Sequence, residues 1–178
     1  GWTREEFEER DVRVLYGDTD SVFVALDPGL ESGVARSRAE SLLTAVQGAL
    51  ADRIAREYEV ESQLLLELER IYTRFFQPRL RGRTEGSKKR YAGLVDGKLH
   101  VVGLESVRRD WPEVTRRLQH GMLSRVFKDA PVVPFVREVV RRVTAGELDA
   151  ELVVRKGLRK GSVDRYTERT PPHVEAAR

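Results

Sequence analysis

The first sixty residues carry a pattern of apolar and polar positions that predicts a β-hairpin followed by a long helix. Two β-rich runs, residues 12–17 and 21–26, flank the acidic triplet Asp18-Thr19-Asp20, which is typical of two strands joined by a tight turn. From residue 32 to 58 the apolar side chains recur every three or four positions, at Ala39, Leu42, Leu43, Val46, Ala49, Leu50, Ile54 and Tyr58. This spacing predicts one amphipathic helix that covers a face of the sheet.

The middle of the chain predicts further strands. Residues 63–76 are rich in Leu, Ile, Tyr and Phe, a composition that favours a strand. After a basic loop, the runs 88–95 and 98–104 flank Asp96-Gly97, a dipeptide favoured in the two-residue turn of a hairpin. We therefore expect an antiparallel sheet in this part of the chain.

The last third differs, because its apolar residues are spaced for helices. After Trp111-Pro112, one helix carries a stripe of Val114, Leu118, Met122 and Val126, and the next carries Phe135, Val139, Val140 and Val143. Gly146 is a typical end for the second helix, and residues 152–158 favour a short strand. Strands with a covering helix, followed by helices, indicate an α+β fold with a boundary near residues 109–112.

Composition excludes several classes of protein. Among the 178 residues there is no Cys, which excludes disulfides, a zinc ribbon and a thiol nucleophile. The apolar runs are far too short for a membrane span, and the charged first ten residues lack the apolar centre of a signal peptide. We therefore expect a cytoplasmic protein with no membrane partner.

Charge is divided unevenly along the chain. Residues 1–70 carry 8 Lys or Arg against 16 Asp or Glu, whereas residues 71–178 carry 24 against 13. Such asymmetry is typical of a half that meets a polyanion, although a solvated basic surface would explain it equally well.

The acidic turn is the strongest candidate for chemistry. Asp18 and Asp20 both project from the tip of the predicted hairpin, and Mg²⁺ prefers carboxylate oxygens together with phosphate oxygens and water. The alternative is a plain turn, in which Asp serves local hydrogen bonds. A calcium-binding EF-hand loop is excluded, because Val22 occupies the third ligand position and no Gly occupies the sixth place.

The six residues Tyr16-Gly17-Asp18-Thr19-Asp20-Ser21, set between two apolar runs, resemble the third motif of family B DNA polymerases. This resemblance implies that Asp20 binds the catalytic metal ions directly and that Asp18 supports it nearer to the primer end. It also implies two Mg²⁺ ions as the cofactor and a palm domain as the surrounding fold.

A basic segment downstream gives a second signal. In Lys88-Lys89-Arg90-Tyr91, a strand would direct Lys88 and Arg90 to one face and Lys89 and Tyr91 to the other. Cations beside an aromatic ring suit a surface that follows phosphates, although Lys also protects exposed edge strands. The segment resembles the family B motif that contacts the primer–template, which implies a DNA-binding role for these four residues.

Other parts of the chain resemble the junction between palm and thumb and then the thumb itself. Gly103-Leu104-Glu105 with Arg108 and Asp110 resembles the junction, although an ion-pair network is an alternative role for these charges. Thumb-like sequence implies DNA binding by Arg155, Lys156 and Arg159. These details are most similar to the bacterial DNA polymerase II type. We expect residues 1–109 to form the C-terminal part of the palm and residues 110–178 the incomplete N-terminal part of the thumb.

The resemblance implies a fragment of a DNA-directed DNA polymerase that acts in DNA replication or repair, with primer–template DNA and dNTP as partners. A sliding clamp is a further possible partner, which would bind through parts of the polymerase outside the 178 residues. The family also needs a metal-binding Asp from a motif of the type Asp-x-x-Ser-Leu-Tyr-Pro-Ser and a fingers helix with Lys and Asn, and residues 1–17 contain neither. We therefore expect the isolated chain to be inactive.

Two alternatives come from other classes. One is a non-catalytic remnant of a polymerase that binds DNA or has only a structural role. The other is a nucleotide-sugar transferase, in which Asp-x-Asp would hold Mn²⁺ and a diphosphate.

Overall fold

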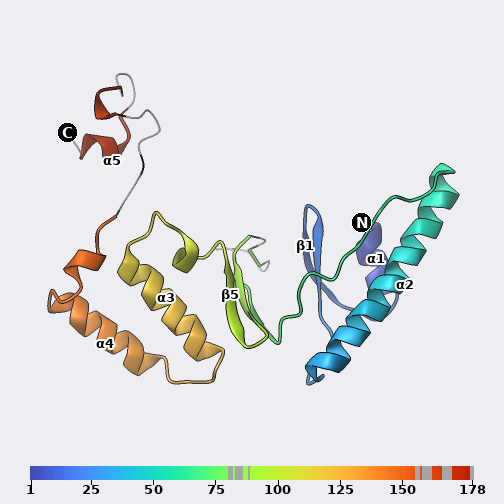
Figure 1. Ribbon diagram of the computed structural model, residues 1–178, viewed down its shortest axis with the longest axis horizontal. Helices are drawn as coiled ribbons and strands as arrows, with labels where there is room; N and C mark the ends of the chain where they lie inside the picture. The colour runs from blue at the N-terminus through green and yellow to red at the C-terminus, as the bar shows by residue number, and fades with distance from the viewer. Residues whose placement is uncertain are drawn as a thin grey trace. The chain divides into compact units, whose positions relative to one another are not determined.

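The chain forms two compact units, residues Gly1–Val102 and Gly103–Arg178, shown in a computed structural model (Figure 1). The structure describes residues 1–79, 82, 86–87, 89–154, 157, 162–165 and 170–176. Helices and small antiparallel sheets occur together, so the predicted α+β class is confirmed. Each unit is described by itself below.

The first unit begins with a short helix and the predicted hairpin. Helix α1 (Trp2–Glu8) leads into strands β1 (Val14–Asp18) and β2 (Ser21–Val24), which pair in antiparallel fashion. Helix α2 (Ser32–Tyr58) follows, so the predicted hairpin and long helix are both confirmed. These elements enclose one apolar core, made of Phe7, Val12, Val14, Leu42, Val46 and Leu50.

Helix α1 was absent from the sequence-based prediction. Its seven residues are too few to display a helical period, and most of them are charged or polar. It is held by Phe7, which is buried in the core, and by Arg10, which binds the Glu6 carboxylate at 2.8 Å and the Glu6 backbone oxygen at 2.6 Å. Helices α1 and α2 pack against each other (Figure 1).

A three-stranded sheet completes the first unit. Strands β3 (Arg74–Phe76), β4 (Tyr91–Val95) and β5 (Lys98–Val102) pair antiparallel in the order β3-β4-β5. Asp96 and Gly97 both take a positive φ, of 49° and 72°, as the favoured two-residue hairpin turn requires. The predicted second hairpin is confirmed, with shorter strands.

The strand predicted over residues 63–76 is wrong for most of its length. Only Arg74–Phe76 pair as a strand, and residues 63–73 have no regular structure. The backbone groups of this segment find other partners: the amide of Leu66 donates to Oε1 of Gln47 on α2 at 2.8 Å, and that of Thr73 donates to the Leu94 carbonyl at 2.9 Å. Apolar composition alone does not supply a neighbouring strand.

The second unit is mainly helical. It contains a 3₁₀ turn η1 (Glu105–Val107), helices α3 (Glu113–Val126) and α4 (Val133–Thr144), two further 3₁₀ turns, η2 (Asp149–Glu151) and η3 (Val163–Arg165), and the short helix α5 (Pro172–Glu175). Helices α3 and α4 pack against each other (Figure 1). Their shared core is made of Val114, Val139 and Leu148, with Leu118, Phe135 and Val143 partly buried against it.

Three details of the predicted helical half are wrong. Val126 and Val140 are about half exposed, whereas Leu123 and Phe127 are buried. Residues spaced four apart in the sequence are rotated around the helix axis by about 40° at each step. After the three steps from Val114 to Val126, Val126 therefore lies well away from the side of α3 that Val114 occupies. The strand predicted over residues 152–158 does not form at residues 152–154, which are exposed without regular structure, while residues 155, 156 and 158 lie outside the described part.

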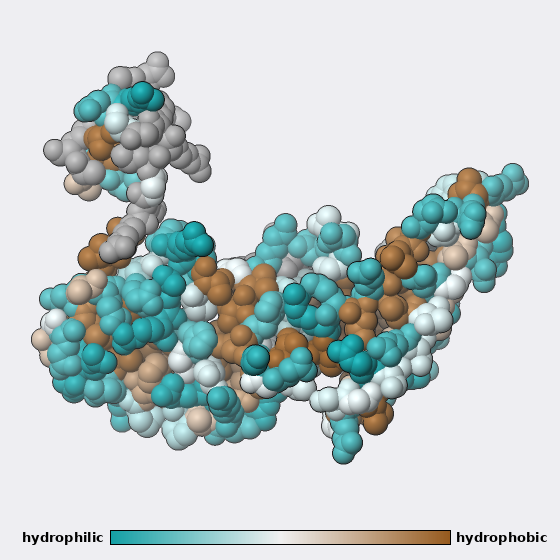
Figure 2. All heavy atoms as spheres, viewed as in Figure 1, coloured by the Kyte–Doolittle hydropathy of each residue, from teal (hydrophilic) through white to brown (hydrophobic). Residues whose placement is uncertain are grey.

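Exposed apolar side chains follow the end of α2. Tyr58, Val60, Leu64 and Leu65 are between 45% and 67% exposed, and Figure 2 shows apolar side chains (brown) among hydrophilic ones over this end of α2. In the part of the chain that the structure describes, no helix has the length and apolarity needed to cross a bilayer.

Candidate functional site

The acidic turn lies at the tip of the first hairpin. Strand β1 ends at Asp18 and β2 begins at Ser21, its pairing partner. The Ser21 hydroxyl donates to the backbone oxygen of Asp18 at 3.2 Å. Between them Thr19 takes a φ of 52°, which is unusual for a β-branched residue and costs about 1–3 kcal/mol. The hydrogen bond from Ser21 thus satisfies the Asp18 carbonyl within the turn itself.

Both carboxylates are accessible. The Asp18 side chain is 26% exposed, and Asp20 is exposed at the tip of the turn. Two carboxylates suit Mg²⁺, which protein sites commonly bind through one or two carboxylates together with substrate phosphates and water. Asp18 and Asp20 therefore fit a magnesium site as a partial set of ligands. Among the residues that the structure describes, no group of three or more His, Cys, Asp or Glu is placed so that it could hold a metal ion.

The basic segment lies beside the acidic turn. Nζ of Lys89 is 3.8 Å from Oδ2 of Asp18 while the lysine side chain stays 78% exposed. The segment is anchored at Ser87, which is buried: its amide donates to the Pro78 carbonyl at 2.9 Å, and its carbonyl accepts from Nε2 of Gln77 at 3.1 Å. Residues far apart in the sequence thus bring an exposed cation next to the Asp18 carboxylate.

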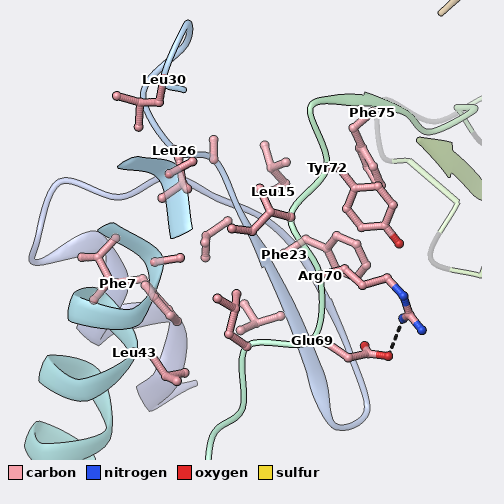
Figure 3. A pocket seen from close by; sticks show the side chains of 18 of the residues that line it. Phe7, Leu15, Phe23, Leu26, Leu30, Leu43, Glu69, Arg70, Tyr72 and Phe75 are labelled. Carbon is pink, nitrogen blue, oxygen red and sulfur yellow. Dashed lines mark hydrogen bonds and ion pairs between the residues drawn. The ribbon is translucent and has the colours of Figure 1, made fainter. Parts of the chain in front are cut away.

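Aromatic rings connect the first hairpin, which carries Asp18, with the second hairpin, β4–β5. The aromatic cluster contains Tyr16 and Phe23 from the first hairpin, Tyr72 and Phe75, and Tyr91 from β4. Tyr16 stacks on Phe23 with ring centres 4.5 Å apart, and Tyr91 lies 5.3 Å from Phe23 and 6.4 Å from Tyr16. Figure 3 shows the rings of Phe23, Tyr72 and Phe75 beside one another.

The approach of Asp18 to Lys89 accompanies a ring contact between Tyr16 and Tyr91. Tyr16 and Asp18 lie two residues apart on β1, so their side chains point to the same face of the strand. Lys89 lies in a turn two residues before Tyr91, where β4 begins, so the strand alternation predicted for Lys89 and Tyr91 does not apply. The aromatic cluster was not predicted.

Burial suppresses the ionisation of two tyrosines of the cluster, Tyr72 and Tyr16. Burial is the main cause that raises the pKa of Tyr72 to about 12, and it also raises the pKa of Tyr16, with the neighbouring tyrosines and Asp18 adding to the effect. Burial lowers the pKa of His100, whose Nδ1 is 2.9 Å from the Tyr72 hydroxyl. These rings stay uncharged near neutral pH, so they act here as packing groups.

A cavity of about 1000 Å³ lies between the first hairpin, the start of α2 and residues 65–75, and Asp20 and Ser21 belong to its lining. Most of the lining is apolar, including Leu15, Leu26 and Leu43 (Figure 3). A triphosphate needs cationic partners. The lining includes Arg70, which pairs with Glu69, and Arg74, but its mainly apolar character does not identify a nucleotide site.

The three charged residues predicted for the junction between palm and thumb form local polar contacts. Arg108 binds Asp110 through two hydrogen bonds, of 3.0 and 2.6 Å. These hydrogen bonds to Asp110 are the main cause that raises the pKa of Arg108, and the charge of Glu105 adds to it. Glu105 itself accepts a hydrogen bond from Gln119 of α3. The contacts fit an ion-pair network, which at such exposure contributes little to stability.

The sequence matches the family model for DNA polymerase family B over residues 3–178. The chain belongs to DNA polymerase family B. The predicted membership is thus confirmed, and a nucleotide-sugar transferase is excluded.

Family B relatives resemble the chain along nearly its whole length. It is 39% identical over 180 residues to DNA polymerase II of Escherichia coli (strain K12), covering 99% of the chain and 23% of that protein. It is 34% identical over 174 residues to DNA polymerase 2 of Aeropyrum pernix, covering 95% of the chain and 18% of that protein. The predicted likeness to bacterial DNA polymerase II is confirmed, and the chain spans less than a quarter of the length of these two family B polymerases.

The site predicted for this family B chain is brought together in part. Asp18, Asp20, Lys89 and Tyr91 lie in one region of the first unit, and Arg90 is exposed between Lys89 and β4. Lys88, Arg155, Lys156 and Arg159 lie outside the described residues. The roles of all these residues in metal and DNA binding remain predictions.

Proposed function

We propose that the chain is the C-terminal part of the palm and the start of the thumb of a DNA-directed DNA polymerase. The complete enzyme would transfer a nucleotide from dNTP to the 3′-hydroxyl of a DNA primer under the direction of a template, in DNA replication or repair in the cytoplasm. The approach of Lys89 to Asp18 carries this proposal, because an exposed lysine that would bind phosphate lies next to an acid that would support the metal, in a family B chain.

Asp20 and Asp18 would hold the metal in this enzyme. Two bound Mg²⁺ ions would activate the attacking hydroxyl and stabilise the leaving phosphate. Asp20 is the more exposed of the two acids and would bind the ions directly. Asp18 forms an ion pair with Lys89 and would support the site nearer to the primer end.

Lys88, Lys89, Arg90 and Tyr91 would contact the primer–template. Lys89 is paired only loosely with Asp18 and remains mostly exposed, so its ammonium group can reach a phosphate oxygen without leaving a buried position. Such contacts would fix the position of the primer without reading its sequence.

The second unit would continue the DNA surface as the thumb, with Arg155, Lys156 and Arg159 as further phosphate contacts. The compact units divide between Val102 and Gly103, a few residues before the proposed palm–thumb boundary at residues 109–110. Glu105, Arg108 and Asp110 lie in this short interval and at its edge, where their contacts would stiffen the link between palm and thumb.

The isolated chain is expected to show no primer extension. It supplies two carboxylates and no cluster of three among its described residues, and residues 1–17 contain neither the other aspartate motif nor the fingers helix that the family resemblance implies. A gel assay of primer extension with the purified 178-residue chain, beside the full-length polymerase that contains it, checks this. Extension by the chain alone that EDTA abolishes would contradict it. DNA binding without extension by the full-length protein would favour a non-catalytic remnant.

A further inference from the structure

The backbone pairing beside the basic segment is uneven in length. Phe76 pairs with Ala92, and Arg79 pairs with Gly86. Three steps along the chain from Phe76 to Arg79 therefore face six steps from Gly86 to Ala92. The longer side has to bulge out of the pairing, and bulges beside functional sites commonly set the direction of a side chain.

The extra length lies between Ser87 and Tyr91, the stretch that contains Lys89. The Ser87 amide donates to the Pro78 carbonyl at 2.9 Å, so the pairing still holds at Ser87, and strand β4 begins at Tyr91. Lys89 lies in a turn between these two fixed points, with Nζ 3.8 Å from Oδ2 of Asp18. The position of Lys89 therefore depends on what holds the ends of the turn.

Gln77 holds one end of this turn. Its Nε2 donates to the Ser87 carbonyl at 3.1 Å. The same carbonyl accepts the Arg90 amide at 3.5 Å, which is longer than a normal N–H···O bond. The bond from Gln77 is therefore the stronger of these two. Because Ser87 is buried, water would replace this bond poorly.

Gly86 makes room for the Gln77 side chain. A Cβ atom on Gly86 would collide with Oε1 and Cδ of Gln77, so the amide occupies the space that a side chain at position 86 would need. The Gln77 side chain is flexible, so an alanine at position 86 would displace the amide. Gln77 and Gly86 thus form one fitted contact next to the basic segment.

We propose that Gln77 is a positioning residue for DNA binding, because it fixes the turn that presents Lys89 to the phosphates of the primer–template. This inference rests on the proposed function. Gln77 carries no charge, so it acts through the backbone at Ser87 rather than by neutralising a phosphate itself. A lysine on a fixed backbone loses less conformational freedom when it binds, which strengthens its phosphate contact.

Gln77→Met in the full-length polymerase removes the hydrogen bond and keeps the length of the side chain. We expect the Kd for primer–template to rise about fivefold and the slope of log K against log salt to fall by about one, as when one phosphate contact is lost. The kcat for extension at saturating DNA should stay within about twofold, because both aspartates are untouched. Fluorescence anisotropy over a salt series and rapid-quench kinetics measure these quantities.

Gln47→Met separates positioning from stability. Oε1 of Gln47 accepts the Leu66 amide at 2.8 Å, so this glutamine also holds a backbone group of the first unit, but it lies on α2 and outside the basic segment. Both variants lose one hydrogen bond and should lower Tm by similar small amounts, whereas only Gln77→Met should change the salt slope. An unchanged slope in Gln77→Met, or an equal change in Gln47→Met, would overturn the proposal.

Gly86→Ala displaces the Gln77 amide without altering Gln77. The backbone of Gly86 lies outside the left-handed region, so alanine is compatible with it, and the same fall in slope is expected. A wild-type slope in Gly86→Ala would overturn the proposal. Failure of both Gln77→Met and Gly86→Ala to fold would overturn it too, because the contact would then serve stability.

Lys89→Ala distinguishes this inference from the proposed function. It should lower the slope by about one, and adding Gln77→Met should lower it no further, because Gln77 acts through Lys89. A further fall would overturn the inference. If the full-length protein does not bind primer–template, or Lys89→Ala binds it with the wild-type slope, the proposed function of the basic segment fails. If Lys89→Ala lowers the slope and Gln77→Met does not, only the role of Gln77 is wrong.

Discussion

Replacing Asp20 with Asn in the full-length polymerase is expected to lower the rate of primer extension about 10³-fold, equivalent to about 4 kcal/mol of transition-state stabilisation. Asn keeps the size of the side chain but removes the charge that would hold the metal. Asp20 is exposed and does not belong to the apolar core, so folding should be unaffected. The Kd for primer–template should stay within about threefold, because the phosphate contacts come from other residues. Rapid-quench kinetics on a defined primer–template measures the rate.

Asp96→Asn is the matched control for this substitution. Asp96 also lies in a two-residue hairpin turn of the first unit, with a φ of 49° that Asn tolerates well. It should extend primers like wild type. Near wild-type extension by Asp20→Asn would mean that the assignment of the metal ligand is wrong.

Replacing both Lys88 and Lys89 with Ala is expected to weaken DNA binding and flatten its dependence on salt. Each lysine that neutralises a phosphate contributes about one to the slope of log K against log salt, so the slope should fall by about two. The affinity lost between about 50 mM and about 200 mM salt would then be about tenfold smaller than in wild type. Fluorescence anisotropy with a labelled primer–template over a salt series measures both quantities.

Lys98→Ala serves as the control for the lysine pair, since Lys98 is an exposed lysine at the start of β5 in the same unit. Its salt slope should match that of wild type. The basic segment leads into β4, the middle strand of its sheet, so protection of an edge strand does not apply to it. An unchanged slope in the double variant would instead mean that the basic segment is a solvated surface that does not contact DNA.

Periodic elements were predictable from the sequence, and irregular ones were not. The spacing of apolar residues gave α2 its full length, Ser32–Tyr58, because a helix of that length repeats its pattern many times. Helix α1 has too few residues to show a period. The strand predicted over residues 63–76 fails at residues 63–73, because side-chain composition does not reveal where backbone hydrogen bonds go, and here some go to Gln47 and Leu94.

The two motifs of the candidate site were predictable from the sequence, but their proximity in space was not. Asp18, Asp20, Lys89 and Tyr91 follow from local sequence, whereas the approach of Asp18 to Lys89 depends on ring contacts between Tyr16 and Tyr91. The register shift between Val14 and Tyr16 leaves no mark in the sequence. Long-range contacts and register are thus what the structure adds.

Cleavage of the protein by bound iron tests the central claim that the acidic turn and the basic segment surround one metal site. Fe²⁺ would replace Mg²⁺ in the full-length polymerase on primer–template DNA, and ascorbate with peroxide would then generate radicals that cut the backbone nearby. We predict cuts in both segments, around residues 18–20 and around residues 87–91, and the loss of both sets in Asp20→Asn. Cuts around residues 18–20 without any around residues 87–91 would contradict the account.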